Sequence, residues 1–467
     1  MVDFGAVPND GNNDYPAAYA AFEAAEAAGG GTIFFPAGNW DLWPTDPGVK
    51  MVNGIPTAEQ GVKISSSLFF VGSDNITFLG EKQNGNPTSF LKFYLWHKQP
   101  ATKYLEVLSG GAGSSVKDVK RYYIFLMNNT KDFTIKDLNI DMGATPVNSG
   151  KAWYSLDEKR YQWDISHKLL ASFDTLKFKN VVIDNIRAKN CRGEVIYNGG
   201  GSEKLLIKDS VFSRSNSSTL SGTFDLELVN TTIRDSANSA VESNCLNDAV
   251  SFDTGEIYPM NHIARGCTFI GLDQSDQGFM KNLPGKKNFG GWLCFNEEGT
   301  YQSVTDSSFS DTLAVAFGPW YEYRNGFRFN VTFNEIPSNQ SGQLIYTWTS
   351  GQHLYTLKGG MSNILWLGDT INVSKDWPNH QLFFYSQPGS EAAGSESPWT
   401  WEAVHFNNTN GGNHMVNRLW VDTGGANSRA NAIFKDWTYD PGISFHSEKF
   451  QFLSAGHVDP AYVNFLE

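Results

Sequence analysis

The hydrophobic and polar positions of the sequence follow a six-residue pattern that recurs along the chain. It consists of an apolar residue, any residue, a turn-forming Asp, Asn or Gly, two further residues, and then Ile, Phe or Tyr. Asp, Asn and Gly favour tight turns, so each instance predicts a corner between two short strands. Recurrence of one such unit is typical of a solenoid. The instances begin at Ile135, Phe178, Ile207, Leu228, Ala264, Val304, Trp366 and Phe434.

The last residue of the pattern is expected to point inward and to stack on its counterpart in the next coil. Residues buried by parallel strands read as apolar positions, and the polar pair just before them suits the corner. The predicted inward stack contains Ile140, Ile183, Phe212, Ile233, Phe269 and Phe309.

Short apolar segments before the next corner predict further strands, among them 194–197, 240–242 and 292–295. Side chains alternate between the two faces of a strand. We therefore expect Val241, Leu293 and Phe295 to point inward, and Glu242 and Trp292 to point outward.

The first 45 residues differ from this pattern. Residues 15–28 are rich in Ala, with Pro16 in the first turn, Asp14 as the expected N-cap and Gly29 as the stop signal, so they predict a helix. The strand Thr32-Ile33-Phe34-Phe35 follows at once. A helix placed there would cover the open end of a solenoid, as terminal caps must.

The text Asp3-Phe4-Gly5-Ala6-Val7-Pro8-Asn9-Asp10-Gly11, together with Gly29-Gly30-Gly31-Thr32-Ile33-Phe34-Phe35-Pro36, closely resembles the opening of pectate-lyase-like β-helices. That superfamily includes polysaccharide lyases, glycoside hydrolases and phage tailspikes. The resemblance implies an all-β, right-handed parallel β-helix with an N-terminal capping helix. We expect one domain over 1–467, with a cap and first coil at 1–45 and loop insertions near 81–120, 146–168, 272–290 and 386–400.

Composition excludes several classes of protein. The chain has 467 residues, 40% hydrophobic and 18% charged, with net charge −13, which argues against nucleic acid as a partner. No apolar run reaches the ~18 residues of a membrane span. There is no signal peptide, but the resemblance starts directly after Met1, so we expect a secreted protein whose export signal has been removed. The four cysteines leave any disulfide pairing open.

Carboxylates suggest hydrolytic chemistry. If the strands stack as expected, Glu242, the pair Glu297 and Glu298, and Glu322 lie at similar places on successive coils. Carboxyl groups one coil apart would be roughly 5 Å apart, and glycosidases use carboxyl pairs at about 5–9.5 Å. The alternative is that these residues are ordinary solvated surface. We predict Glu242 as the main catalytic carboxylate.

Aromatic residues near the predicted strand ends suit a sugar chain, because flat rings stack on the apolar faces of sugars. The alternative is an aromatic stack inside the core. Arg234 and Arg265 are expected to orient the substrate. The aromatic candidates for substrate binding are Trp292, Trp320, Tyr321 and Trp348.

These patterns predict a secreted enzyme that cleaves a polysaccharide, with hydrolysis favoured over β-elimination. One alternative is a lyase that acts by β-elimination on a uronate glycan, and another is a non-catalytic adhesin or tail-fibre module. The short motifs of polygalacturonases and of the main pectate lyases are missing, so no catalytic residue is carried over. No cofactor or metal is expected, although Asp273 and Asp276 leave Ca²⁺ open.

Overall fold

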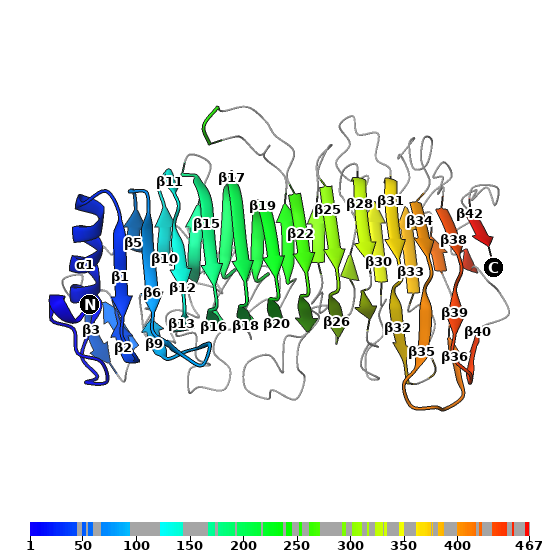
Figure 1. Ribbon diagram of the computed structural model, residues 1–467, viewed down its shortest axis with the longest axis horizontal. Coiled ribbons are helices and arrows are strands. Elements are labelled where there is room, and N and C mark those ends of the chain that lie inside the picture. Colours follow the sequence, from blue (N-terminus) through cyan, green and yellow to red (C-terminus); the bar gives the residue numbers. More distant parts are fainter. Residues whose placement is uncertain are drawn as a thin grey trace, which may run out of the picture.

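The computed structural model shows a long solenoid of parallel strands with its helix at one end (Figure 1). It describes residues 1–43, 49–52, 55–58, 67–93, 122–142, 167–172, 176–191, 194–215, 218–236, 240–244, 252–254, 261–270, 292–295, 301–310, 315–316, 323–329, 331–333, 345–349, 361–374, 376, 382–386, 399–416, 420–422, 432–445, 451–452 and 463–466.

Each coil contributes strands to three parallel sheets, which we call I, II and III in chain order within a coil. Sheet I contains β5 (Ser67–Val71), β10 (Tyr122–Met127), β14 (His167–Ser172), the first part of β17 (Ile196–Lys208), the first part of β19 (Leu220–Val229), β21 (Val241–Asn244) and β24 (Trp292–Phe295). The same place in later coils is taken by β27 (Val315–Ala316), β30 (Ile345–Thr349), β33 (Leu382–Ser386), β37 (Trp420–Asp422) and β41 (Gln451–Phe452).

Sheet II follows sheet I in each coil, and β17 and β19 run through the corner between them. Its other strands are β1 (Gly31–Phe35), β6 (Ile76–Gly80), β11 (Thr130–Lys131), β12 (Thr134–Lys136), β15 (Phe178–Asp184), β22 (Asn261–Arg265), β25 (Tyr301–Thr305), β28 (Tyr323–Phe329), β31 (Met361–Leu367), β34 (Trp399–Glu402), β38 (Ala432–Lys435) and β42 (Val463–Leu466).

Sheet III is a continuous 12-stranded sheet that runs from the first coil to the last. Its strands are β2 (Gly38–Leu42), β9 (Ser89–Phe93), β13 (Leu138–Asp141), β16 (Arg187–Cys191), β18 (Val211–Ser215), β20 (Thr232–Ser236), β23 (Thr268–Ile270), β26 (Ser308–Ser310), β29 (Thr332–Phe333), β32 (Thr370–Val373), β35 (His405–Asn408) and β39 (Thr438–Tyr439).

Three small pairs complete the described strands: β3 (Val49–Val52) with β4 (Ile55–Ala58), β7 (Lys82–Gln83) with β8 (Asn86–Pro87), and β36 (His414–Val416) with β40 (Ile443–Phe445). In the three long sheets, a connection that leads from one strand to the next parallel strand of the same sheet is almost always right-handed. The fold is therefore the predicted right-handed parallel β-helix. The insertion expected at 81–120 began too early, because β9 lies inside that range and belongs to sheet III.

The predicted capping helix is α1 (Tyr15–Ala27), preceded by the short η1 (Val2–Phe4). Its side chains Ala18, Ala21 and Phe22 are buried, and Phe22 packs edge-on against Phe69 of the next coil at 5.4 Å between ring centroids. The helix thus closes the apolar interior at the N-terminal end, the place where it stands in Figure 1.

The predicted inward stack runs down sheet III. Ile140, Phe212, Ile233 and Phe269 are almost fully buried, and the last three stand in register on successive coils. Phe309 continues this register opposite Phe269, although its side chain lies outside the described residues.

Ile183 is buried as predicted, but it belongs to sheet II, where it pairs with Ile135 and Ile207. The sheet III position of this coil is taken by Ala188, between Ile140 and Phe212. The six-residue pattern of this coil therefore begins at Ile183 rather than at Phe178, and its last member is a small alanine.

The third residue of the pattern forms the corner between sheets II and III, which we call the Asx corner. Each such residue has a left-handed backbone, with φ between 48° and 72°. Asn and Asp tolerate this conformation better than other non-glycine residues, which explains the sequence preference. The corner residues are Asp137, Asn185, Asp209, Asn230, Gly266, Asp306, Gly368, Ala403 and Asp436.

Sheet I follows a different local rule, in which two adjacent residues both point into the core. The pairs are Leu68 and Phe69, Ile124 and Phe125, Leu169 and Leu170, Val195 and Ile196, and Ala240 and Val241, all buried. The residue after each pair therefore lies on the outer face.

The register of sheet I pairs Val241 with Trp292 and Glu242 with Leu293. The side chains of Glu242 and of residues 292–295 lie outside the described residues, so the facing expected for them stays a prediction.

Candidate functional site

The outer face of sheet I carries a row of residues in register over successive coils. We call this row, together with the Lys168–Glu194 pair described next, the polar face. The row runs through Phe70, Leu126, Ala171, Tyr197 and Ser221, and the strand register continues to Glu242 and Leu293, whose side chains lie outside the described residues. It begins apolar, with Leu126 and Ala171 packed in a small cluster separate from the core, and it turns polar at Tyr197 and Ser221. Packing of the core does not require this change from apolar to polar residues along one face.

Lys168 and Glu194 form an ion pair on this side of the solenoid. Their side chains are only 4% and 7% exposed, and the Lys168 ammonium lies 4.6 Å from the centre of the Tyr197 ring. Burying two charges costs free energy that mutual attraction only partly returns. The pair is therefore an expensive arrangement that a stable core alone would not need.

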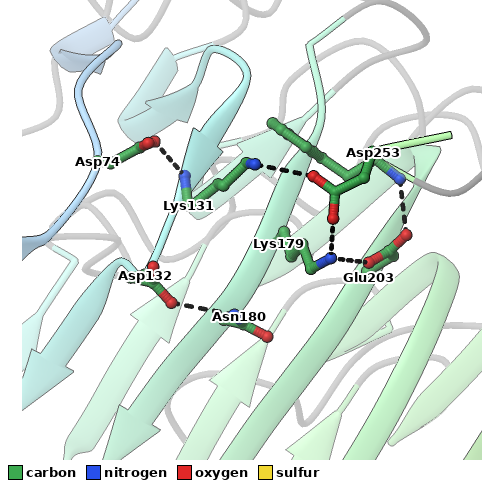
Figure 2. Close-up of polar contacts among 8 residues, drawn as sticks. Asp74, Lys131, Asp132, Lys179, Asn180, Glu203 and Asp253 are labelled. Atoms are coloured by element: carbon green, nitrogen blue, oxygen red, sulfur yellow. Dashed lines mark hydrogen bonds and ion pairs between the residues drawn. The ribbon is translucent and has the colours of Figure 1, made fainter.

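A second charged group lies at the corner between sheets I and II (Figure 2). Lys131 of β11 and Lys179 of β15 are on neighbouring coils, and both bind the carboxylate of Asp253, Lys131 at 2.8 Å. Lys179 also pairs with Glu203 of β17 at 3.0 Å. These hydrogen bonds, that of Lys131 first, lower the pKa of Asp253 to about 2.

Asp253 belongs to residues 252–254, which we call the strap. They lie in the connection from β21 to β22, and they reach back to strands of earlier coils. In Figure 1 this short green segment stands above the ends of β15 and β17. The backbone N–H of Phe252 donates to Glu203 at 2.6 Å, so the strap touches three successive coils.

Glu203 has a carboxylate neighbour on the next coil, Asp225 of β19. The two strands pair through Ser202 with Phe224 and Leu205 with Leu226, which puts Glu203 and Asp225 side by side. Burial raises the pKa of Asp225, while hydrogen bonds from Asn261, whose N–H donates at 3.1 Å, and the charge of Lys204 oppose that rise and the Glu203 charge adds to it. Glu203 instead accepts hydrogen bonds from Lys179 and from the backbone N–H of Phe252.

This corner brings together a carboxyl group whose pKa is raised by burial, Asp225, and a carboxylate that binds Lys179 and the N–H of Phe252, Glu203. Neighbouring acids in different environments are the arrangement that assigns acid and base roles in enzymes. Perturbed acids of this kind gather at functional sites. We refer to Glu203 and Asp225 as the carboxylate pair.

Most of the residues predicted as site residues fall outside the described part of the chain. Glu242 is in register with Ser221, but its side chain lies outside the described residues. Trp348 stands opposite Tyr385 in β30 and β33. The residues Glu297, Glu298, Trp320, Tyr321, Glu322, Asp273 and Asp276 lie outside the described residues.

The two predicted arginines are described, and they lie apart. Arg234 is on sheet III and donates to its neighbour Asp235 at 2.8 Å. Arg265 ends β22 on sheet II and pairs with Glu227 at 3.2 Å. They belong to different sheets, and the role predicted for either of them in orienting a substrate stays a prediction.

Sequence reasoning did not predict Glu203, Asp225, Phe252 or Asp253 as site residues. The bend of β17 and β19 through a corner, with register shifts on either side of Ser202, leaves no periodic signal. The one available signal was the length of the connection after Glu242, because long connections in a regular solenoid often carry function.

Two buried cysteines act as small core residues. Cys191 donates to the Glu194 carbonyl and Cys267 to the Arg265 carbonyl, both at 3.4 Å, and burial raises the pKa of Cys267 to about 11. Within the described ranges, no three His, Cys, Asp or Glu side chains are grouped to hold a metal ion. The one α-helix in that part of the chain is too short and polar to cross a membrane.

The fold and this site define a parallel β-helix protein with a charged, partly buried outer surface. No protein-family model matches the chain. Over 92 residues it is 38% identical to mannuronan C5-epimerases AlgE1 and AlgE3 of Azotobacter vinelandii, which is 19% of this chain and 7% and 5% of those proteins. The matched stretch therefore spans less than a tenth of either relative.

Solved structures with similar folds share little sequence with it. An exopolygalacturonase from Thermotoga maritima is 12% identical, with a TM-score of 0.42 over 97% of this chain and 89% of that one. The AlgE4 A-module of Azotobacter vinelandii is also 12% identical, with a TM-score of 0.39 over 98% of each chain. A tailspike mutant of Escherichia coli bacteriophage HK620 in complex with a pentasaccharide is 14% identical, with a TM-score of 0.39 over 95% of this chain and 65% of that one.

Proposed function

We propose that this protein is a polysaccharide-cleaving enzyme that hydrolyses glycosidic bonds at the corner between sheets I and II. The observation that carries the proposal is the carboxylate pair. Glu203 and Asp225 lie on neighbouring coils; Glu203 binds Lys179 and the N–H of Phe252, whereas burial raises the pKa of Asp225. A solenoid is suited to a polymer, because successive coils repeat a binding surface along its axis.

The proposed roles follow from these environments. Asp225, whose pKa is raised, gives its proton to the glycosidic oxygen as the bond to the leaving sugar breaks. Glu203 attacks the anomeric carbon and forms a glycosyl ester, which water then hydrolyses with Asp225 as the base. Neighbouring strands are about 4.8 Å apart, close to the ~5–5.5 Å between carboxyls of retaining enzymes. Retention of anomeric configuration is the expected outcome.

Glu242, the candidate from sequence, continues the strand register of the row on sheet I and remains a competing assignment. Its register neighbours are Ser221 and Leu293, so neither adjacent coil supplies an acid at its level. A catalytic Glu242 would therefore need a carboxylate such as Glu297 or Glu298 from a connection.

The test compares three isosteric variants, Asp225→Asn, Glu203→Gln and Glu242→Gln, on a panel of polygalacturonate, alginate, xylan and mannan. Loss of the acid and base group should slow turnover of Asp225→Asn about 10²–10⁴-fold. Loss of the nucleophile should slow Glu203→Gln at least as much, and Glu242→Gln should stay active. The matched control is Glu402→Gln, which removes an acid paired with Lys435 at 2.8 Å on a different coil. Full activity of both pair variants, with Glu242→Gln inactive, would move the site to the outer face of sheet I.

A β-elimination reaction is the second candidate, and one observation favours it. Elimination needs a base and a cation that offsets the uronate charge, and Lys168 lies against the Tyr197 ring beside Glu194. Products with an unsaturated sugar end, together with activity lost in Tyr197→Phe and kept in Asp225→Asn, would select the lyase. Binding without new reducing ends or unsaturated products would identify a glycan adhesin.

A further inference from the structure

We infer that Phe252 of the strap contacts the bound glycan and that Asp253 is a positioning residue that holds it there. The inference rests on the proposed function, since the backbone of Phe252 donates to Glu203 of the carboxylate pair. The sequence predicts no role for the strap. A surface loop needs no bonds to three separate coils in order to close, yet the strap makes them.

The strap is held at three points on three coils. Asp253 receives hydrogen bonds from Lys131 and Lys179, and Glu203 receives one from the N–H of Phe252. Lys179 has a half-hidden side chain, 21% exposed, whereas Asp253 is 47% exposed. An exposed ion pair contributes little to stability by itself, so a network that spans three coils fixes position more than it adds free energy.

Phe252 is the residue that this network fixes. Its ring is half-buried, so part of it is open to a ligand, and the Lys131 ammonium lies 5.0 Å from the ring centre. The backbone N–H of Phe252 donates to Glu203, so this residue is attached directly to a proposed catalytic carboxylate, while its ring extends over Lys131 of β11. A partly exposed aromatic ring is a platform for the apolar face of a sugar, so we assign it to a sugar unit bound on the coils before the carboxylate pair.

Asp253 acts through its neighbours. Its carboxylate binds Lys179, and Lys179 binds Glu203, so loss of the Asp253 charge releases the strap and also changes the surroundings of Glu203. A residue that only closed a loop would leave both substrate binding and the pH profile unchanged.

The experiment measures binding by affinity electrophoresis with the four panel glycans and cleavage of the glycan that the wild type binds. Phe252→Ala should raise KM about two- to tenfold, as expected for one stacked ring, with kcat little changed, and Phe252→Tyr should restore it. Asp253→Asn should raise KM similarly and also shift the acid limb of the pH profile. Lys435→Met, which breaks an ion pair remote from the strap, is the matched control and should match the wild type.

Two results would overturn the inference. One is an unchanged KM in Phe252→Ala while Asp225→Asn is inactive, which leaves the proposed function intact and removes the ring from the site. The other is a wild type that binds none of the glycans, which overturns the proposed function as well. If the wild type binds but does not cleave, the proposed hydrolysis fails, and weaker binding by Phe252→Ala still supports the contact.

Discussion

At the Asx corner each coil places a residue in the same left-handed backbone position, whereas on the polar face the residues change from coil to coil. Asp137 and Asn185 show the first behaviour, since their side chains bond to each other at 2.6 Å along the solenoid. Lys168 and Glu194 show the second, because the next coils carry Ser or Thr near their level. Backbone geometry explains the polar residues of the corner and leaves those of the face unexplained.

Polar residues in a solenoid can therefore be present for two different reasons. A polar residue that recurs at a constrained φ is there for the turn, even when its side chain is charged. A polar pair that occurs once, is buried, and lies on an outer face calls for another explanation. The following predictions test that distinction.

The largest effect is expected for Lys168→Met. It leaves Glu194 buried without its cation, and breaking a buried ion pair from one side costs about 3–5 kcal/mol of unfolding free energy. Denaturant unfolding followed by circular dichroism measures it. The double variant Lys168→Met, Glu194→Gln should recover most of the loss, and a single variant as stable as the wild type would show that the pair is not buried in solution.

Gly222→Ala should be nearly as harmful. Gly222 has φ 121°, and an added Cβ would lie 1.9 Å from the carbonyl oxygen of Asn198 on the previous coil. Strain and overpacking together predict a loss of about 3 kcal/mol. The control is Gly85→Ala, which has φ 81° and nothing within 4 Å of the added Cβ, and isolates backbone strain. Equal losses in the two variants would show that the close approach is relieved at no cost.

Asn185→Ala should cost about 1–2 kcal/mol in thermal unfolding, because alanine pays more to adopt φ 52° and loses the bonds to Asp137 and the Gly85 carbonyl. Asn185→Gly keeps the backbone freedom and loses only the bonds, so it should lie between. Activity on the panel glycans should not change. A large loss of turnover would mean that the corner also serves the site.

At the same corner, a substitution of Ala403 is expected to raise the unfolding free energy rather than lower it. It is an alanine with φ 56° where other coils carry Asp, Asn or Gly. Ala403→Gly should relieve strain and raise the unfolding free energy by about 0.5–1 kcal/mol, a little offset by the greater entropy of the unfolded chain. Calorimetry measures it, and a lower melting temperature would contradict the assignment of strain to this residue.

The smallest effect concerns pH. Because the folded pKa of Asp253 is depressed to about 2, its ion pairs persist above its ordinary value of ~3.9 and weaken only as pH falls toward 2. NMR titration of labelled Asp carboxyl carbons should therefore show Asp253 ionised at pH 4. A midpoint near the ordinary value would mean that the strap is detached in solution.

The fold could be predicted because its signals are local. The helix at Tyr15–Ala27, the Asx corner and the sheet III stack each depend on a few consecutive residues. The error at Phe178 arose because Asn180 also has a left-handed φ of 56° inside β15, so two overlapping patterns competed. Alanine at the true stack position removed the signal that would have separated them.

The site could not be predicted in the same way. Glu203 and Asp225 meet only because β17 and β19 bend through the corner with shifted register. The partners of Asp253 are 122 and 74 residues away in the chain. The strand β21 contains Glu242 in register with Ser221, and both the outward facing and the catalytic role expected for Glu242 stay predictions.

The strap also has a consequence for the order in which the chain folds. Most contacts of a solenoid join adjacent coils, so folding can spread from neighbour to neighbour. The bond from Asp253 to Lys131 instead closes over 122 residues, and it can form only after the intervening coils have stacked. Contacts between residues that are far apart in the chain form late, because the chain loses much conformational entropy when it closes the loop between them. Docking of the strap is thus expected to be the last event in this half of the molecule, so the proposed active site is completed only after the coils from β11 to β21 have stacked.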